Sequence, residues 1–191
     1  MASRIGPLLT VADLDAFPDD GNRYELIEGE LFVSRAPRFP HQLVLQNLQV
    51  ALFIYLRSNP IGLLIPGPGA VFSEYDAVIP DLAFARHERW DKIVANDRFV
   101  EAPDLVVEVL SPGKENRERD VQAKRQLYGK YGVEEYWIVD PDHRLVLVYR
   151  LKGQALDEIV KLTHEDVLDS PILPGFRLNV GEIFNLHYPI R

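Results

Sequence analysis

The chain has 191 residues, of which 47% are hydrophobic and 26% charged, a composition typical of a globular protein with one substantial core. It contains no cysteine, which excludes disulfides, thiolate metal ligands and cysteine nucleophiles. The formal net charge of −8 differs from the positive balance of indiscriminate nucleic-acid binders. No apolar run has the length of a membrane span and no secretory signal is recognisable, so we expect one cytoplasmic domain over residues 1–191.

The first half of the chain predicts a short helix, a hairpin, a long helix and a series of strands. Thr10 is a candidate N-cap of the short helix, and the run RYELIEGELFVS predicts two strands around a tight turn at Glu28 and Gly29. From His41 to about residue 57, leucines recur every three or four residues, which predicts an amphipathic helix. Extended segments are then expected at 63–65, 70–73 and 78–85.

The second half of the chain predicts strands around a second helix. The run DLVVEVL after Pro103 is the most strand-like segment, and a helix from about Arg117 to Tyr131 ends at Gly132. The strands EYWIVD and LVLVYR follow, and the final run EIFNL suits either a helical turn or an extended cover for the sheet. This alternation predicts the α/β or α+β class, with a mixed sheet and helices packed on it.

Glu108 interrupts an apolar run that otherwise resembles a buried strand. An ionised carboxylate inside a sheet costs several kcal/mol unless its pKa rises or a cation compensates it. Glu108 is therefore a candidate site residue. A position at an edge that faces solvent, or an ion pair with one arginine, would explain it equally well.

Asp81 has a comparable setting, because the apolar run VIPDLAF predicts that it lies within a strand, directly after Pro80. The same pair is compatible with a turn that leads into the strand, where the aspartate accepts a backbone N–H. The pair Pro103-Asp104 has the same form, and for Asp104 we favour the turn.

Lys124 lies on the face that the second helix is expected to bury, within about 80° of Val121, Tyr128 and Tyr131. A lysine there either extends its ammonium to the edge or meets an acid on the neighbouring strand. Lys124 is separated from Glu108 by one loop and two turns of the helix. The helix can therefore return Lys124 over the carboxyl end of that strand.

The segment around this helix is locally basic within an acidic chain. Its cations outnumber its acids and are compatible either with phosphate contacts or with a solvated face of ordinary ion pairs. Arg35 and Arg38, ahead of the first long helix, have the same two interpretations. The cations of the segment are Lys114, Arg117, Arg119, Lys124, Arg125 and Lys130.

Five motifs in order resemble the Uma-two family of restriction endonucleases, in the PD-(D/E)XK phosphodiesterase superfamily. They are RYELIEGEL, a helix that begins at His41-Gln42, IPDLAF, APDLVVEVLSP and RDVQAKRQLYGKYGVEEYWIVDP, and the resemblance runs from about Leu9 to Leu186. The resemblance implies a restriction-endonuclease-like fold. It also implies that the chain cleaves nucleic acid, with DNA as the expected substrate, and that cleavage depends on magnesium or manganese.

By this resemblance, Asp81 and Glu108 are catalytic acids and metal ligands, and the backbone carbonyl of Val109 is a further ligand. Many superfamily members carry a lysine two residues after the second acid, where this chain has Leu110. The resemblance implies that Lys124 takes the place of that lysine.

Glu28 and His41 match further polar positions of the family, and the resemblance implies that they complete the metal shell or steer the substrate. Two other functions stay open. The chain could be a catalytically silent member that binds nucleic acid or protein, or a metal-independent hydrolase that uses Asp81 and Glu108 as paired carboxylates. A cut in both strands of a duplex favours a homodimer, and no membrane partner is expected.

Overall fold

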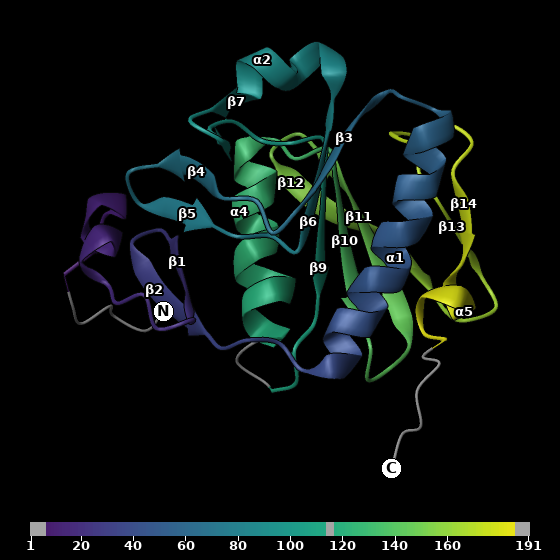
Figure 1. Ribbon diagram of the computed structural model, residues 1–191, viewed down its shortest axis with the longest axis horizontal. Helices are drawn as coiled ribbons and strands as arrows, with labels where there is room; N and C mark the ends of the chain where they lie inside the picture. Colours follow the sequence, from purple (N-terminus) through teal and green to yellow (C-terminus); the bar gives the residue numbers. More distant parts are fainter. Residues whose placement is uncertain (1–6, 114–116, 186–191) are drawn as a thin grey trace.

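The computed structural model describes residues 7–113 and 117–185, and Figure 1 shows its helices and strands. The helices are η1 (Val11–Ala16), α1 (Phe39–Ser58), η2 (His87–Arg89), α2 (Trp90–Ile93), the π-helical η3 (Arg119–Lys124), α4 (Arg125–Tyr131) and α5 (Val180–Ile183). The strands are β1 (Arg23–Ile27), β2 (Glu30–Ser34), β3 (Gly62–Pro66), β4 (Ala70–Ser73), β5 (Asp76–Val78), β6 (Leu82–Arg86), β7 (Val94–Ala95), β8 (Arg98–Phe99), β9 (Leu105–Val109), β10 (Glu135–Asp140), β11 (Leu145–Lys152), β12 (Ala155–Leu162), β13 (Val167–Asp169) and β14 (Arg177–Asn179).

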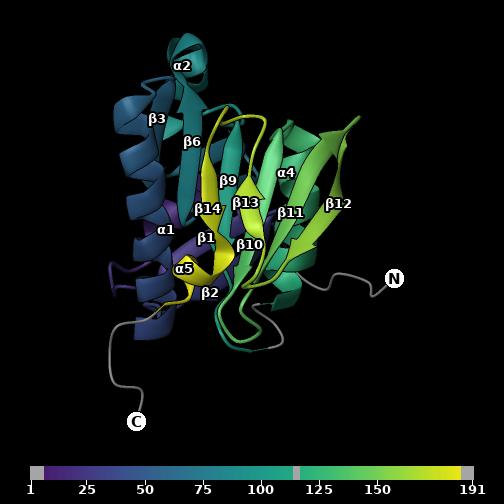
Figure 2. The same ribbon diagram turned by 90° about the vertical axis from the view of Figure 1, so that its right-hand side faces the viewer.

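The largest layer of the molecule is a six-stranded mixed sheet with the order β12-β11-β10-β9-β6-β3. The β9–β10 pair is parallel and the others are antiparallel, as expected when a helix connects β9 to β10. Helix α1 and the segment from β13 to α5 pack on one face (Figure 2), and α4 packs on the other (Figure 1). No helix in the described ranges is long and apolar enough to cross a membrane.

A second sheet lies beside α4 and has the order β2-β1-β5-β4-β8-β7. Its hairpin β1–β2 turns at Glu28 and Gly29, as predicted, and both residues have positive φ angles, of 52° and 74°. This backbone is typical of the tight turn that joins two twisted strands. Strand β2 forms one edge of the sheet, and this edge lies toward the helix of η3 and α4.

Strand β9 is buried along its whole length at the centre of the mixed sheet, as the sequence predicts. Alternate side chains face opposite layers. Leu105 and Val107 join the core under α1, whereas Val106 joins the core under α4. Glu108 is in phase with Val106, so the alternation directs its carboxylate toward the helix that carries Lys124.

The prediction of one strand at 78–85 is wrong. Two strands occupy this region, β5 in the second sheet and β6 in the mixed sheet, and the chain leaves one for the other at Pro80 and Asp81. A proline cannot donate to a strand ladder, which is compatible with a break at this point. Asp104 lies in the bend directly before β9, and it accepts a hydrogen bond of 2.8 Å from the backbone N–H of Arg86 on β6 rather than from a residue of its own turn.

The predicted helix at 117–131 is present, but its first part is π-helical from Arg119 to Lys124. Segments of this kind are rare and are frequent at functional sites. The π-helical segment buries both Asp120 and Lys124. For the run EIFNL, the structure shows a helical turn at its start, because the short helix α5 ends within the run at Ile183.

Candidate active site

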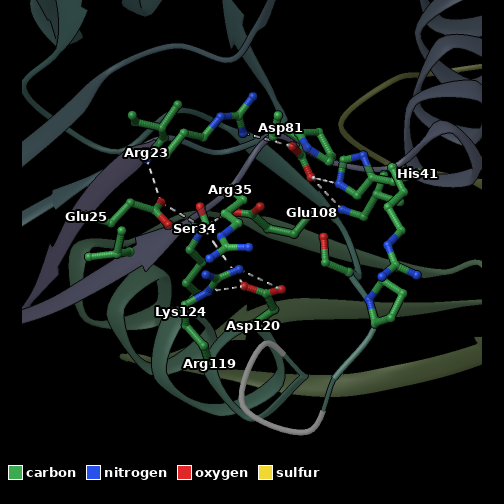
Figure 3. A pocket seen from close by; sticks show the side chains of 18 residues that line it. Arg23, Glu25, Ser34, Arg35, His41, Asp81, Glu108, Arg119, Asp120 and Lys124 are labelled. Carbon is green, nitrogen blue, oxygen red and sulfur yellow. Dashed lines mark hydrogen bonds and ion pairs between the residues drawn. The ribbon is translucent and has the colours of Figure 1, made fainter. Parts of the chain in front are cut away.

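A polar pocket of about 300 Å³ lies where the carboxyl end of β9, the break before β6, the β1–β2 hairpin, the start of α1 and η3 meet (Figure 3). Four acids and six basic side chains line it. They are Glu25, Asp81, Glu108 and Asp120, with Arg23, Arg35, Arg38, His41, Arg119 and Lys124. The pocket therefore unites segments that are far apart in the sequence.

Lys124 is the central cation of this pocket and is only 1% exposed. Its Nζ lies 2.8 Å from Oε1 of Glu108 and 2.8 Å from Oε1 of Glu25, and 4.0 Å from Oδ1 of Asp120. Burial alone would lower the pKa of Lys124, but these three carboxylates raise it above its ordinary value. Lys124 is therefore a fixed positive charge at neutral pH.

Glu108 is buried and accepts two hydrogen bonds at Oε1, from Lys124 at 2.8 Å and from the hydroxyl of Tyr128 at 2.9 Å. Burial raises the pKa of Glu108 to about 8, and the nearby charges of Asp81 and Asp120 add to this effect although Lys124 opposes it. Lys124 alone therefore does not offset the burial of Glu108 among acidic neighbours. A bound cation would lower the pKa of Glu108.

Asp81 is buried beside the end of β9, and its Oδ2 accepts the backbone N–H of Val109 at 2.9 Å. The same oxygen lies 3.2 Å from Nε2 of His41, and Nη1 of Arg23 lies 3.4 Å from Oδ1. Burial would raise the pKa of Asp81, but the contacts with His41 and Val109 and the charge of Lys124 hold it below its usual value. Asp81 is ionised at neutral pH, as a metal ligand must be.

His41 lies in the first turn of α1, and only 5% of it is exposed. Its Nε2 contacts Asp81, but its Nδ1 is the one buried side-chain nitrogen or oxygen in the described residues without a hydrogen-bond partner. An unsatisfied buried polar atom is costly, so the unpaired Nδ1 of His41 destabilises the fold in this state. Through its Nε2, His41 contacts Asp81 in the pocket.

Glu28 does not lie in this pocket. Its side chain is exposed at the hairpin turn, and its backbone N–H donates to Oδ1 of Asp76 at 2.6 Å. The hairpin acid that lines the pocket is Glu25, whose Oε1 also accepts the N–H of Ile79 at 2.8 Å. The structure therefore brings together Asp81, Glu108, Lys124 and His41, but not Glu28.

Sequence reasoning did not identify Glu25, Asp120 or Arg23 as site residues. Asp120 carried a usable signal, because it precedes Lys124 by one helical turn and so shares its buried face. Glu25 carried none, since an acid within a hairpin strand is ordinarily exposed. Its burial depends on Lys124, which is distant in the sequence.

The predicted basic segment divides between the pocket and the rest of the surface. Arg119 lines the pocket, whereas Arg117 pairs with Asp140 and Lys130 pairs with an aspartate on β5. Arg125 lies over an aromatic ring, with its guanidinium carbon 5.3 Å from the ring centroid. Lys114 lies outside the described residues. The arginines that line the pocket are Arg23, Arg35, Arg38 and Arg119.

The donor set of the pocket suits a hard cation, because carboxylate and carbonyl oxygens are what magnesium prefers. Within residues 7–113 and 117–185, no three His, Asp or Glu side chains are arranged as a metal-binding group. Magnesium does not need such a group, since it is usually bound through one or two carboxylates, water and substrate phosphates. Asp81 and Glu108 meet that smaller requirement, and Val109 lies beside them.

The fold is α+β, with a mixed sheet between helices and two acids and a lysine at the carboxyl end of its central strand. These features define the restriction-endonuclease-like class of nucleases. The family model Uma2, described as "Putative restriction endonuclease", matches residues 11–181, and the chain belongs to this family. This membership supports a nuclease function in general terms.

A solved structure has the same fold. It is the crystal structure of a "putative nuclease belonging to DUF820" from Anabaena variabilis ATCC 29413. The TM-score is 0.74 and the identity 20%, and the match covers 92% of this chain and 97% of the other. No curated protein matches the chain.

Proposed function

We propose that the chain is an endonuclease that hydrolyses phosphodiester bonds in DNA and requires magnesium or manganese. The observation that carries this proposal is the position of Lys124, within 2.8 Å of Glu108 in a pocket that also holds Asp81. Membership of the Uma2 family supports the same reaction class. The arginines around the pocket suit a polyanionic substrate.

Asp81, Glu108 and the backbone carbonyl of Val109 would hold the cation. When bound, the cation would supply an activated water and offset negative charge on the phosphate. Glu108 uses Oε1 for Lys124 and Tyr128, which leaves its other oxygen for a ligand. The contact of His41 with Asp81 orients that carboxylate, so we assign His41 a positioning role.

Lys124 would act as a fixed cation and not as a general base. Its raised pKa keeps the ammonium protonated at neutral pH, and its contacts with Glu108 and Glu25 hold the side chain in one place. A charge fixed in this way stabilises the transition state without reorganisation during the reaction. Arg23 and Arg119, on opposite sides of the lysine in Figure 3, would contact the phosphate.

A metal-independent hydrolase is the second candidate, and one observation favours it. The pKa of Glu108, raised to about 8, is that of a general acid, whereas Asp81 stays ionised. Such a pair could hydrolyse a glycoside without a cation. A catalytically silent member that binds nucleic acid or protein is the third candidate. The dependence of activity on metal separates the three.

The test is cleavage of plasmid DNA and of single-stranded DNA and RNA, with magnesium, with manganese and with EDTA. We expect cleavage of DNA that EDTA abolishes and that Glu108→Gln lowers by at least 10²-fold, on the scale of losing one site residue. The control is Glu165→Gln, since Glu165 is exposed and does not line the pocket. Cleavage that persists in EDTA or in Glu108→Gln contradicts the proposal.

We also propose that the chain acts as a homodimer. A cut in both strands of a duplex is served by two sites related by a two-fold axis. Sedimentation equilibrium with and without duplex DNA would measure the mass of the assembly. A monomer under both conditions would contradict this part of the proposal.

A further inference from the structure

A second groove continues from the pocket along the edge of β2 and the helix of η3 and α4. Its volume is about 550 Å³, which is within the range of about 300–1,000 Å³ for sites that bind small ligands. Val33 and Arg119 line both the pocket and this groove, so the two adjoin each other at these residues. A strand that enters the pocket can therefore extend into the groove.

The helical wall of this groove presents two neutral amides. Gln122 and Gln126 are one helical turn apart on the same face, and both are exposed. Neither side chain makes a hydrogen bond to another described residue. Each amide therefore has two N–H donors and one carbonyl acceptor for a ligand.

The opposite wall is largely apolar. It is formed by Leu31, Phe32 and Val33 of β2, and Val33 is 50% exposed. Ala123, which follows Gln122 in the helix, also lines the groove. A flat ligand with polar edges could therefore face the amides with an edge and the apolar wall with a face.

Fewer cations line the groove than line the pocket. Arg119 is the only cation among the described lining residues of the groove, whereas four arginines and Lys124 line the pocket. Arg119 lies at the end that the groove shares with the pocket. Phosphates would thus be held in the arginine-rich pocket, whereas a neutral ligand could occupy the groove.

We propose that this groove binds unpaired bases of the strand whose phosphate lies in the pocket, and that Gln122 and Gln126 are its base-contacting residues. This inference rests on the proposed function for the position of the phosphate. A glutamine amide pairs with the N6 and N7 positions of adenine, so the groove favours adenine. The apolar wall of β2 adds contacts that any base can make.

The test is equilibrium binding of labelled single-stranded oligonucleotides of one length, followed by fluorescence anisotropy. The probes are an adenine oligomer, a thymine oligomer and an abasic oligomer that keeps the same phosphates, with calcium in place of magnesium and strand integrity checked on gels. We expect the adenine oligomer to bind roughly 10-fold more tightly than either of the others. The variant Gln122→Ala/Gln126→Ala should bind all three about equally.

The matched control is Gln46→Ala, because Gln46 is an exposed amide on α1 that lines neither the pocket nor the groove. It should keep the preference for adenine. Replacing exposed helical glutamines with alanine does not weaken a helix, so circular dichroism should be unchanged.

Equal affinity for the adenine and abasic oligomers overturns the inference. So does an absence of binding, or a preference that survives the double variant. Cleavage by the native chain is measured separately, so failure of the groove and failure of the nuclease proposal are distinguishable.

Discussion

Lys124 and Glu108 are 16 residues apart in the sequence, and Nζ of the lysine lies 2.8 Å from Oε1 of the glutamate in a buried site. The contact joins the π-helical segment to the central strand of the mixed sheet. The same ammonium also contacts Glu25 on the hairpin, so one cation connects three separate elements. This relationship links the stability of the fold to the chemistry of the pocket.

Replacement of the lysine should therefore destabilise the metal-free chain. Lys124→Met leaves Glu25 and Glu108 buried without their cation, and loss of one partner of a buried ion pair costs about 3–5 kcal/mol. Denaturation by urea would measure this loss in the free energy of unfolding. The control Lys161→Met, at an exposed position, should stay within about 0.5 kcal/mol of the native chain.

A second substitution should restore part of that loss. In Lys124→Met/Glu108→Gln, one of the two buried carboxyl groups that lose their cation is replaced by an amide that cannot ionise, so the double variant should be more stable than Lys124→Met alone. If Lys124→Met is as stable as the native chain, or if the double variant loses the sum of both single effects, the two residues are not coupled as the structure indicates.

The pH dependence of stability provides a second prediction. The pKa of Glu108 is about 8 in the fold, above the ordinary value of 4.5, so the folded state binds more protons than the unfolded state between these two pH values. The stability contributed by protonated Glu108 is thus present below pH 4.5 and is lost as the pH rises toward 8. The slope is at most about 1.4 kcal/mol per pH unit.

Glu108→Gln removes this titration, so the variant should gain stability relative to the native chain as the pH rises from 5 to 8. Urea denaturation at several pH values, in EDTA, would measure the difference in the free energy of unfolding. A constant difference across this range would show that Glu108 titrates at its ordinary pKa.

Two arginines should contribute to binding of DNA without taking part in the reaction. Arg35 and Arg38 line the pocket, and each phosphate contact contributes about 0.9 to the slope of log K against log salt concentration. Arg35→Ala and Arg38→Ala should each reduce that slope by about 1 in binding titrations on duplex DNA. Arg57→Ala, at the last turn of α1, is the control, and an equal reduction there would contradict a specific role.

The local patterns of the sequence predicted most of the elements that hold the site. The apolar run around Glu108 predicted a central strand, and the helical face of Lys124 predicted its return to that strand. Both depend on periodicity within one element. The expected strand at 78–85 failed because an apolar run does not reveal a transfer between two sheets, although Pro80 marked the place.

The site was only partly predictable, because some of its residues are buried by contacts between elements that are distant in the sequence. Asp81 and Glu108 stood out because each interrupts an apolar run. Glu25 did not, because its burial is set by a lysine on another element. Glu28, which the family resemblance suggested, is exposed at the hairpin turn. Its functional role stays a prediction.

The most direct test of the proposed site is magnesium binding by isothermal calorimetry. The native chain would be compared with Asp81→Ala and Glu108→Ala, and with the control Asp157→Ala, which replaces an exposed acid on β12. We predict that the native chain and Asp157→Ala bind magnesium and that both pocket variants lose binding. A native chain that binds neither magnesium nor manganese, even with DNA present, would contradict a metal-dependent nuclease and favour the catalytically silent alternative.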